Sequence, residues 1–339
     1  MDRRARSPWI APLCGALGAL AIGCGSETDE TARPTPEAPR PAGPPTSPAP
    51  FAEDGADAPV SLRFEWPDGA RASVESSRSL ERPGVGATGR ATARYRISIE
   101  RRGERTTLRS RELSIHPAEG GPGENLAGMM VAATFLPSAR FTHDVGALTL
   151  LEPERTSETL RDAVSTAVTP EARALPGWQS IEPIVAGDPE MLRRQAQSLL
   201  SPLVTLDGLE VESERGVSAR ARRPTSEGPA ADQSTTTRLL GIGPCFEGDD
   251  PRGCATVEVV ASYTADPSVT TPGPGGGTIL SMEGRLRVLV EPRTLLPHRM
   301  EAAKTTRFVV PGEADAPETI TEVETLGWEF SWSRGTIRD

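Results

Sequence analysis

The residues best suited to acid–base or metal chemistry are few in this chain, and their spacing does not favour it. The histidines are His116, His143 and His298, and none of them falls in an HExxH motif or another paired metal-ligand spacing. His143 precedes Asp144, but adjacent residues on a strand point to opposite faces, so these side chains would not act together as base and orienting acid. We therefore expect ordinary surface or loop histidines and no metal site.

Acidic residues repeat at every second position in two runs, Glu210–Glu212–Glu214 and Glu322–Glu324. Residues two apart on a strand share a face, and apolar residues take the alternate positions, so we expect both runs to face water. A glycosidase-like pair instead requires one carboxyl whose pKa is raised in an apolar cleft. These carboxylates therefore do not predict catalysis.

Motifs for nucleotide binding and for serine nucleophiles are absent or out of context. The sequence GVGATG at 84–89 matches GxGxxG, but no apolar strand precedes it and no helical pattern follows it, so it predicts a glycine-rich hairpin loop. No GxSxG or SxxK motif occurs. We expect a protein that is not an enzyme and that requires no cofactor.

The amino terminus carries the most specific pattern. Arginines at positions 3, 4 and 6 precede an apolar stretch at 9–22, which is too short to span a bilayer. The stretch ends in LAIGC at 20–24, and polar residues follow directly. Here the chain resembles bacterial lipoprotein precursors, whose lipobox places a small residue immediately before the cysteine that receives the lipid. Cys24 matches that cysteine, although Ala21 stands where the family prefers Leu.

The resemblance implies cleavage after Gly23 and a lipid anchor on Cys24 that holds the mature protein on a membrane. Gly25 stands where an inner-membrane retention signal would place Asp, so the outer membrane is favoured. The segment at 33–50 is rich in proline, cannot form a core, and predicts an extended spacer. We divide the chain into a signal peptide at 1–23, the lipidated Cys24 with a disordered linker at 24–58, and one β-rich domain with a helical insertion at 59–339.

The remaining cysteines of the exported chain are Cys245 and Cys254, which flank a turn-rich octet between two strand-like runs. In a compartment that oxidises thiols, this arrangement predicts a hairpin disulfide. Free thiols are the alternative, and a metal pair is disfavoured because no second Cys or His pair completes a set of four ligands.

Alternating apolar and polar residues predict strands on both sides of a helical middle. Residues 60–66 alternate, and the turn at 67–69 predicts a hairpin with the run that follows. The run at 91–99 alternates as well, and a phase slip beyond Leu108 predicts a β-bulge. Further alternating runs follow between 257 and 332.

The middle of the chain has helical periodicity instead. Apolar residues recur at intervals of three and four between Ser157, a candidate cap, and Pro170. A second amphipathic pattern begins at Asp188 and ends at Pro202. The apolar run at 124–136 fits either a strand or a helix.

We therefore expect an α+β fold, with an antiparallel sheet of about eight to eleven strands and a helical segment at about 155–203. This order of elements resembles the half-barrel lipoproteins and lipoprotein carriers of bacterial envelopes (the LolA/LppX type), in which helices cap a curved sheet. The resemblance implies a helix face that packs against the sheet, with residues that serve as core more often than as ligand contacts: Leu160, Val164, Met191, Leu192 and Leu199.

The charge of the chain bears on which classes of partner it can bind. The net charge of -10 disfavours nucleic acid as a partner. A membrane-anchored module that binds an apolar molecule such as a lipid is our first hypothesis, and a surface-tethered scaffold for another envelope protein is the alternative. An oversized internal cavity would support the first, whereas a solid core with an exposed apolar patch would support the second.

Overall fold

The computed structural model describes residues 47–53, 58–82, 86–103, 105–117, 134–142, 147–174, 192, 193, 196, 200, 202–212, 216–225, 228–247, 253–264, 278–311 and 317–333. Cys24, the expected signal peptide and most of the proline-rich segment lie outside these residues. Within the described part of the chain, no helix is both long and apolar enough to cross a membrane.

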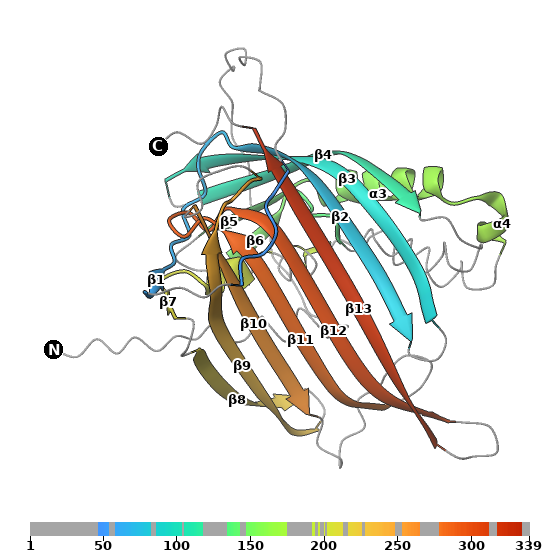
Figure 1. Ribbon diagram of the computed structural model, residues 1–339. Coiled ribbons are helices and arrows are strands. Elements are labelled where there is room, and N and C mark those ends of the chain that lie inside the picture. Colours follow the sequence, from blue (N-terminus) through green and yellow to red (C-terminus); the bar gives the residue numbers. More distant parts are fainter. Residues whose placement is uncertain are drawn as a thin grey trace.

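One strongly curved, open antiparallel sheet of 11 strands dominates the molecule (Figure 1). Its strand order is β6-β5-β4-β3-β2-β13-β12-β11-β10-β9-β8. The strands are β2 Arg71–Arg82, β3 Gly86–Arg102, β4 Arg105–Pro117, β5 Ala139–Thr142, β6 Ala147–Leu150, β8 Val217–Thr225, β9 Gly228–Gly243, β10 Cys254–Thr264, β11 Thr278–Val290, β12 Pro297–Pro311 and β13 Pro317–Trp332. The expectation of a predominantly antiparallel sheet is confirmed.

The two halves of the chain meet at the centre of the sheet. β2 pairs with β13, so that Ala72 lies opposite Trp332. From this seam the sheet extends through β3 to β6 on one side and through β12 to β8 on the other. The helical middle of the sequence joins the two edges.

Alternation along β3 shows why these residues form strands. Ala93, Tyr95 and Ile97 are buried on one face, whereas Arg94 and Arg96 between them are exposed. The bulge predicted beyond Leu108 is confirmed, because the β3–β4 register shifts between Arg94 and Arg96. Glu112, on the bulged strand, has φ 59°.

The hairpin predicted for residues 60–74 is wrong in its pairing. The short strand β1, Val60–Ser61, pairs with β7, Glu210–Val211, instead of with β2. Leu62, Phe64 and Trp66 continue the alternation and are buried. Their burial explains the apolar pattern without a ladder to the next strand, because period-two alternation reports which face is buried and not which partner is bonded.

Residues 47–53 belong to the folded domain, although the sequence assigned 24–58 to a disordered linker. Ala49 is fully buried and its N–H donates to the Cys245 carbonyl at 3.0 Å. Ala52 N–H donates to Thr256 Oγ1 at 2.9 Å, and Pro48 forms a bridge with Phe246. The linker prediction failed here because specific backbone hydrogen bonds, which composition does not encode, hold this segment.

The described helices are α3, Pro153–Ala167, and α4, Pro170–Arg173, beside β4 at one end of the sheet (Figure 1). Helix α3 begins before the expected cap Ser157, because Pro153 supplies a preformed first helical residue. The positions described between 192 and 205 are also helical, and residues 202–205 carry helical structure beyond Pro202. Pro202 therefore does not end the helical segment.

Candidate functional site

An apolar cavity lies where the helical middle of the chain covers the aromatic side chains of the sheet. Trp328 and Phe330 of β13 contribute to its wall, and Leu200 and Leu203 contribute from the helical segment. Its volume is about 10 Å³, at the lower limit of the space that one water molecule needs. Side chains therefore fill this cavity almost completely.

Hydrogen bonds hold the tryptophans that line this cavity, Trp66 and Trp328, and the buried Trp332 of the same strand β13. Trp66 Nε1 donates to the Leu295 carbonyl at 3.0 Å, Trp332 Nε1 to the Pro297 carbonyl at 2.7 Å, and Trp328 Nε1 to the Thr134 carbonyl at 2.8 Å. Buried indole N–H groups need such partners. The wall is therefore a fixed surface, whereas Leu200 and Leu203 approach it from a separate element.

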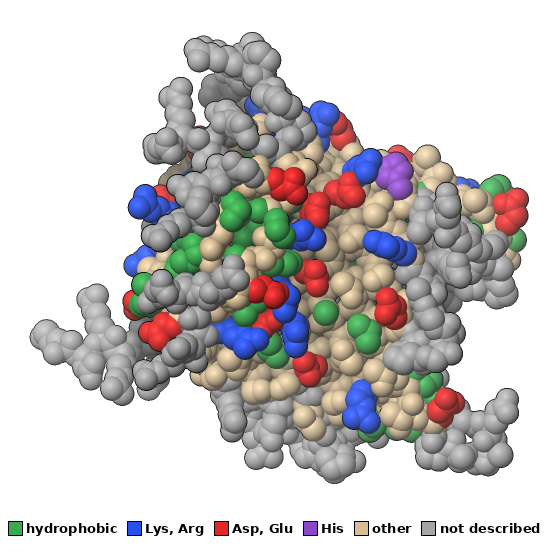
Figure 2. Space-filling model, viewed as in Figure 1, with side chains coloured by type: hydrophobic (Ala, Val, Ile, Leu, Met, Phe, Trp, Pro, Cys, Tyr) green, Lys and Arg blue, Asp and Glu red, His purple; other side chains and the backbone are tan. Residues whose placement is uncertain are grey.

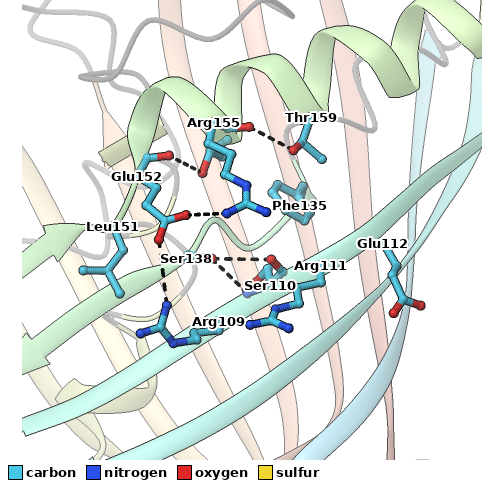
Figure 3. A pocket seen from close by; sticks show the side chains of 11 residues that line it. Arg109, Ser110, Arg111, Glu112, Phe135, Ser138, Leu151, Glu152, Arg155 and Thr159 are labelled. Atoms are coloured by element: carbon cyan, nitrogen blue, oxygen red, sulfur yellow. Dashed lines mark hydrogen bonds and ion pairs between the residues drawn. The ribbon is translucent and has the colours of Figure 1, made fainter. Parts of the chain in front are cut away.

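A larger and polar pocket lies between β4 and α3 (Figure 3). Its volume is about 290 Å³. Arg109 and Arg111 reach it from the strand, and Arg155 points toward it from the helix (Figure 3). β5 pairs with β4 only from Arg105 to Leu108, so the pocket opens where the strand leaves that partner.

Two of the three arginines around this polar pocket form ion pairs with described residues, and the third does not. Glu152 approaches Arg155 at 3.2 Å and Arg109 at 4.0 Å, and Arg109 also lies 3.4 Å from Glu100. Arg111 has no ion-pair partner among the described residues. The pocket therefore holds an arginine whose charge a ligand could neutralise.

Two unusual backbone conformations border the polar pocket. Glu112 has φ 59° and Glu152 has φ 52°, and both side chains line the pocket. Left-handed conformations are costly for residues other than glycine and cluster at functional sites. The hydroxyl of Ser110, also in the lining, is buried without a hydrogen-bond partner. Both observations mark this pocket as a candidate binding site.

A short segment, residues 134–138, separates the polar pocket from the apolar cavity. Phe135 borders the first and Leu136 borders the second. The Thr134 carbonyl accepts from Tyr95 as well as from Trp328, at 3.2 Å for the tyrosine hydroxyl. Burial raises the pKa of Tyr95 above its usual range, so the hydroxyl stays protonated and continues to donate.

The carboxylates of the paired runs do not all face water as expected. Glu210 and Glu212 are exposed, but Glu324 is largely buried. Glu324 lies 2.7 Å from Arg78 and 3.5 Å from Lys304. Burial works to raise the pKa of Glu324, but the two cations outweigh it and hold the pKa below the usual value. The expectation failed for Glu324 because its face of β13, which carries Trp328 and Phe330 further along the strand, meets the cations Arg78 and Lys304 at this position.

The predicted disulfide is present, with Cα atoms of Cys245 and Cys254 5.0 Å apart. His298 lies beside it and is fully buried, so the expectation of a surface or loop histidine is wrong for this residue. His116 is exposed, and His143 lies outside the described residues. No local pattern places His298 beside the cysteines, because it lies more than forty residues from either of them.

The residues expected to line a ligand have mixed outcomes. Leu160, Val164 and Leu192 are buried, but none of them borders the apolar cavity, whose leucines are Leu136, Leu200 and Leu203. Met191 and Leu199 lie outside the described residues. A helical pattern predicts which side is buried, but not which buried residue borders a cavity.

No family model matches the chain, and no curated protein matches it.

Proposed function

We propose that this protein is a lipid-anchored, non-catalytic protein of the bacterial cell envelope that binds an apolar ligand or lipid inside its curved sheet. The amino-terminal pattern that ends at Cys24 supports the anchor and the outer membrane as its location. The observation that carries the binding function is the aromatic wall of the sheet, which is covered by leucines of a helical segment.

A ligand enters this interior by displacing Leu200 and Leu203. The cavity of about 10 Å³ is too small for a lipid chain. The two leucines belong to helical positions that lack strand-ladder bonds to the sheet, so they can move away while the 11-stranded ladder stays intact. The polar pocket beyond Phe135 then offers partners for the polar end of an amphiphilic ligand.

Native mass spectrometry of the full chain carrying Cys24→Ser tests the proposal. Leu203→Ala removes side-chain volume at the cavity and should increase the fraction of molecules that retain a co-purified lipid. Leu206→Ala is the matched control, because Leu206 is equally buried in the same segment but does not border the cavity. Each variant should lose about 2 to 5 kcal/mol of folding stability. Because this loss is similar in both, a difference in lipid content would report on the cavity and not on stability.

The small volume of the apolar cavity favours a second candidate function, a surface-tethered scaffold for another envelope protein. A filled interior is what such a scaffold requires. If neither the parent chain nor Leu203→Ala retains any lipid after gentle extraction, the ligand-binding proposal fails and the scaffold takes its place. Equal lipid content in the Leu203 and Leu206 variants would also overturn the cavity as the binding site.

A further inference from the structure

A set of three potential metal ligands lies together in the interior. The sulfur atoms of Cys245 and Cys254 and a ring nitrogen of His298 are all within 4.8 Å of one another. The cysteines are 6% and 0% exposed, and His298 is 0% exposed. Thiolate sulfur and imidazole nitrogen are the ligands that zinc and monovalent copper prefer.

The hydrogen bonds of His298 leave one of its nitrogens without a partner. Nε2 lies 2.9 Å from Glu291 Oε1. A carboxylate accepts hydrogen bonds, so Nε2 carries the hydrogen and the other ring nitrogen, Nδ1, presents a lone pair when the ring is neutral. Nδ1 is buried without a hydrogen-bond partner. An unsatisfied buried acceptor is costly and is explained when an ion or another group can use it.

The contact with Glu291 matches the arrangement found around metal-binding histidines. A ligating imidazole usually donates its second ring N–H to a carboxylate, which fixes the ring and makes the ligating nitrogen more basic. Phe246 packs edge-to-face on the His298 ring, with centroids 4.6 Å apart. These two neighbours hold the ring in place beside the sulfurs.

We propose that Cys245, Cys254 and His298 form a binding site for a thiophilic metal ion, Zn²⁺ or Cu⁺, when the disulfide is reduced. A dithiol reductant breaks the S–S bond, supplies two electrons and two protons, and itself becomes a disulfide. The metal then displaces the two thiol protons and takes three ligands, namely both thiolates and the His298 nitrogen. With the disulfide closed, the sulfurs are bonded to each other and the site is shut.

The site is placed where metal binding would stabilise the fold. Cys245 lies two residues beyond the end of β9, Cys254 is the first residue of β10, and His298 lies at the start of β12. The Cys245 carbonyl is held by Ala49 of the amino-terminal segment. A metal ion would therefore replace the covalent link of the disulfide with a link that also includes a third strand.

The test uses the full chain with Cys14 and Cys24 changed to Ser, so that Cys245 and Cys254 are the only thiols. The protein is reduced with a dithiol, freed of it without oxygen, and mixed with Zn²⁺ or Cu⁺ in competition with a chromogenic chelator. We expect one ion per reduced chain, none per oxidised chain, and a higher Tm for the metal-loaded reduced form.

Variants separate ligation from folding. His298→Ala should weaken binding by the reduced chain at least tenfold, and Glu291→Gln, which removes the carboxylate behind the ring, should weaken it 10- to 100-fold. Circular dichroism of each variant in its oxidised form checks that the fold survives. X-ray absorption of the loaded parent should show sulfur and nitrogen ligands together. Unchanged affinity in His298→Ala, or equal binding by oxidised chains, would overturn the proposal.

Discussion

Arg111 is the residue at which the polar pocket can be tested. Its charge has no ion-pair partner among the described residues, and its side chain lines the pocket. If the pocket holds the anionic end of an amphiphile, Arg111→Gln should weaken binding of dodecanoate about tenfold, because a charged hydrogen bond contributes about 1.5 to 3 kcal/mol. Binding of dodecanol should not change. Isothermal titration calorimetry measures both.

Arg307→Gln is the control for that experiment, because Arg307 is an exposed arginine on β12 that does not line the pocket. It should leave the binding of both probes unchanged. A loss of dodecanoate binding in the Arg307 variant would mean that long-range attraction by the protein's overall charge, and not a contact in the pocket, accounts for the binding. If neither probe binds the parent chain, the ligand-binding proposal itself is refuted.

Single residues also show where sequence reasoning reached its limit. The Cys245–Cys254 pair could be predicted, because both partners lie in one hairpin and the chemistry of the compartment is a general rule. His298 could not be placed beside them, because the contact depends on how β12 is positioned relative to β9 and β10. Glu324 was misplaced for a similar reason, since its partner Arg78 comes from the distant strand β2.

At the scale of elements, the ladder β2–β13–β12 contains a charged group that should make stability depend on pH. Glu324 has a pKa below its usual value of 4.5, despite burial, because of Arg78 and Lys304. The stability that it contributes is present above the ordinary pKa and is lost as the pH falls through the lower pKa of the folded state. We therefore expect the free energy of unfolding to fall as the pH drops below about 4.5.

Glu324→Gln should remove part of this dependence and cost about 3 kcal/mol at neutral pH, because it removes the carboxylate that lies 2.7 Å from the buried Arg78. Urea denaturation between neutral and acidic pH measures both effects. Glu329→Gln on the same strand is the control, since its pair with Arg299 is exposed at 3.5 Å and should contribute about 0 to 1 kcal/mol. A Glu324 variant with the parent's pH profile would contradict the assignment.

Elements were predictable where the signal is local. The period-two pattern of β3 and the phase slip in β4 were read correctly, because burial on one face dictates alternation and an extra residue breaks it. Helix α3 begins earlier than the sequence predicts, because its N-cap position is Glu152, not Ser157, and Pro153 is its first residue. The partner of residues 60–66 is a tertiary property and was missed.

At the scale of the whole molecule, the strand order could not have been derived from the sequence. The seam between β2 and β13 joins residues about 250 positions apart, and no local pattern specifies that pairing. The sequence did predict that the strands surround a helical middle, because composition and periodicity change there. The curvature of the sheet and its open edges follow from the tertiary arrangement (Figure 1). Figure 2 shows one face of this arrangement, on which charged side chains of both signs are interspersed and hydrophobic side chains are also exposed.

The proposed membrane anchor concerns the whole molecule and can be tested as well. The folded domain begins its contacts by residue 47, where Pro48 bridges to Phe246. About twenty residues then separate Cys24 from the domain, and at about 3.1 Å per residue an extended proline-rich chain would hold the domain some tens of ångströms from the bilayer.

In a bacterial host, labelled palmitate should mark the parent chain if Cys24 carries the anchor, and the chain should sediment with outer-membrane vesicles. Cys24→Ser should abolish the label and release the protein into the soluble fraction, whereas Cys14→Ser, which changes a cysteine of the expected signal peptide, should leave both properties unchanged. Recovery of unlabelled, uncleaved parent chain from the cytosol would refute the anchor and would also remove the oxidising compartment in which the Cys245–Cys254 disulfide is expected to persist.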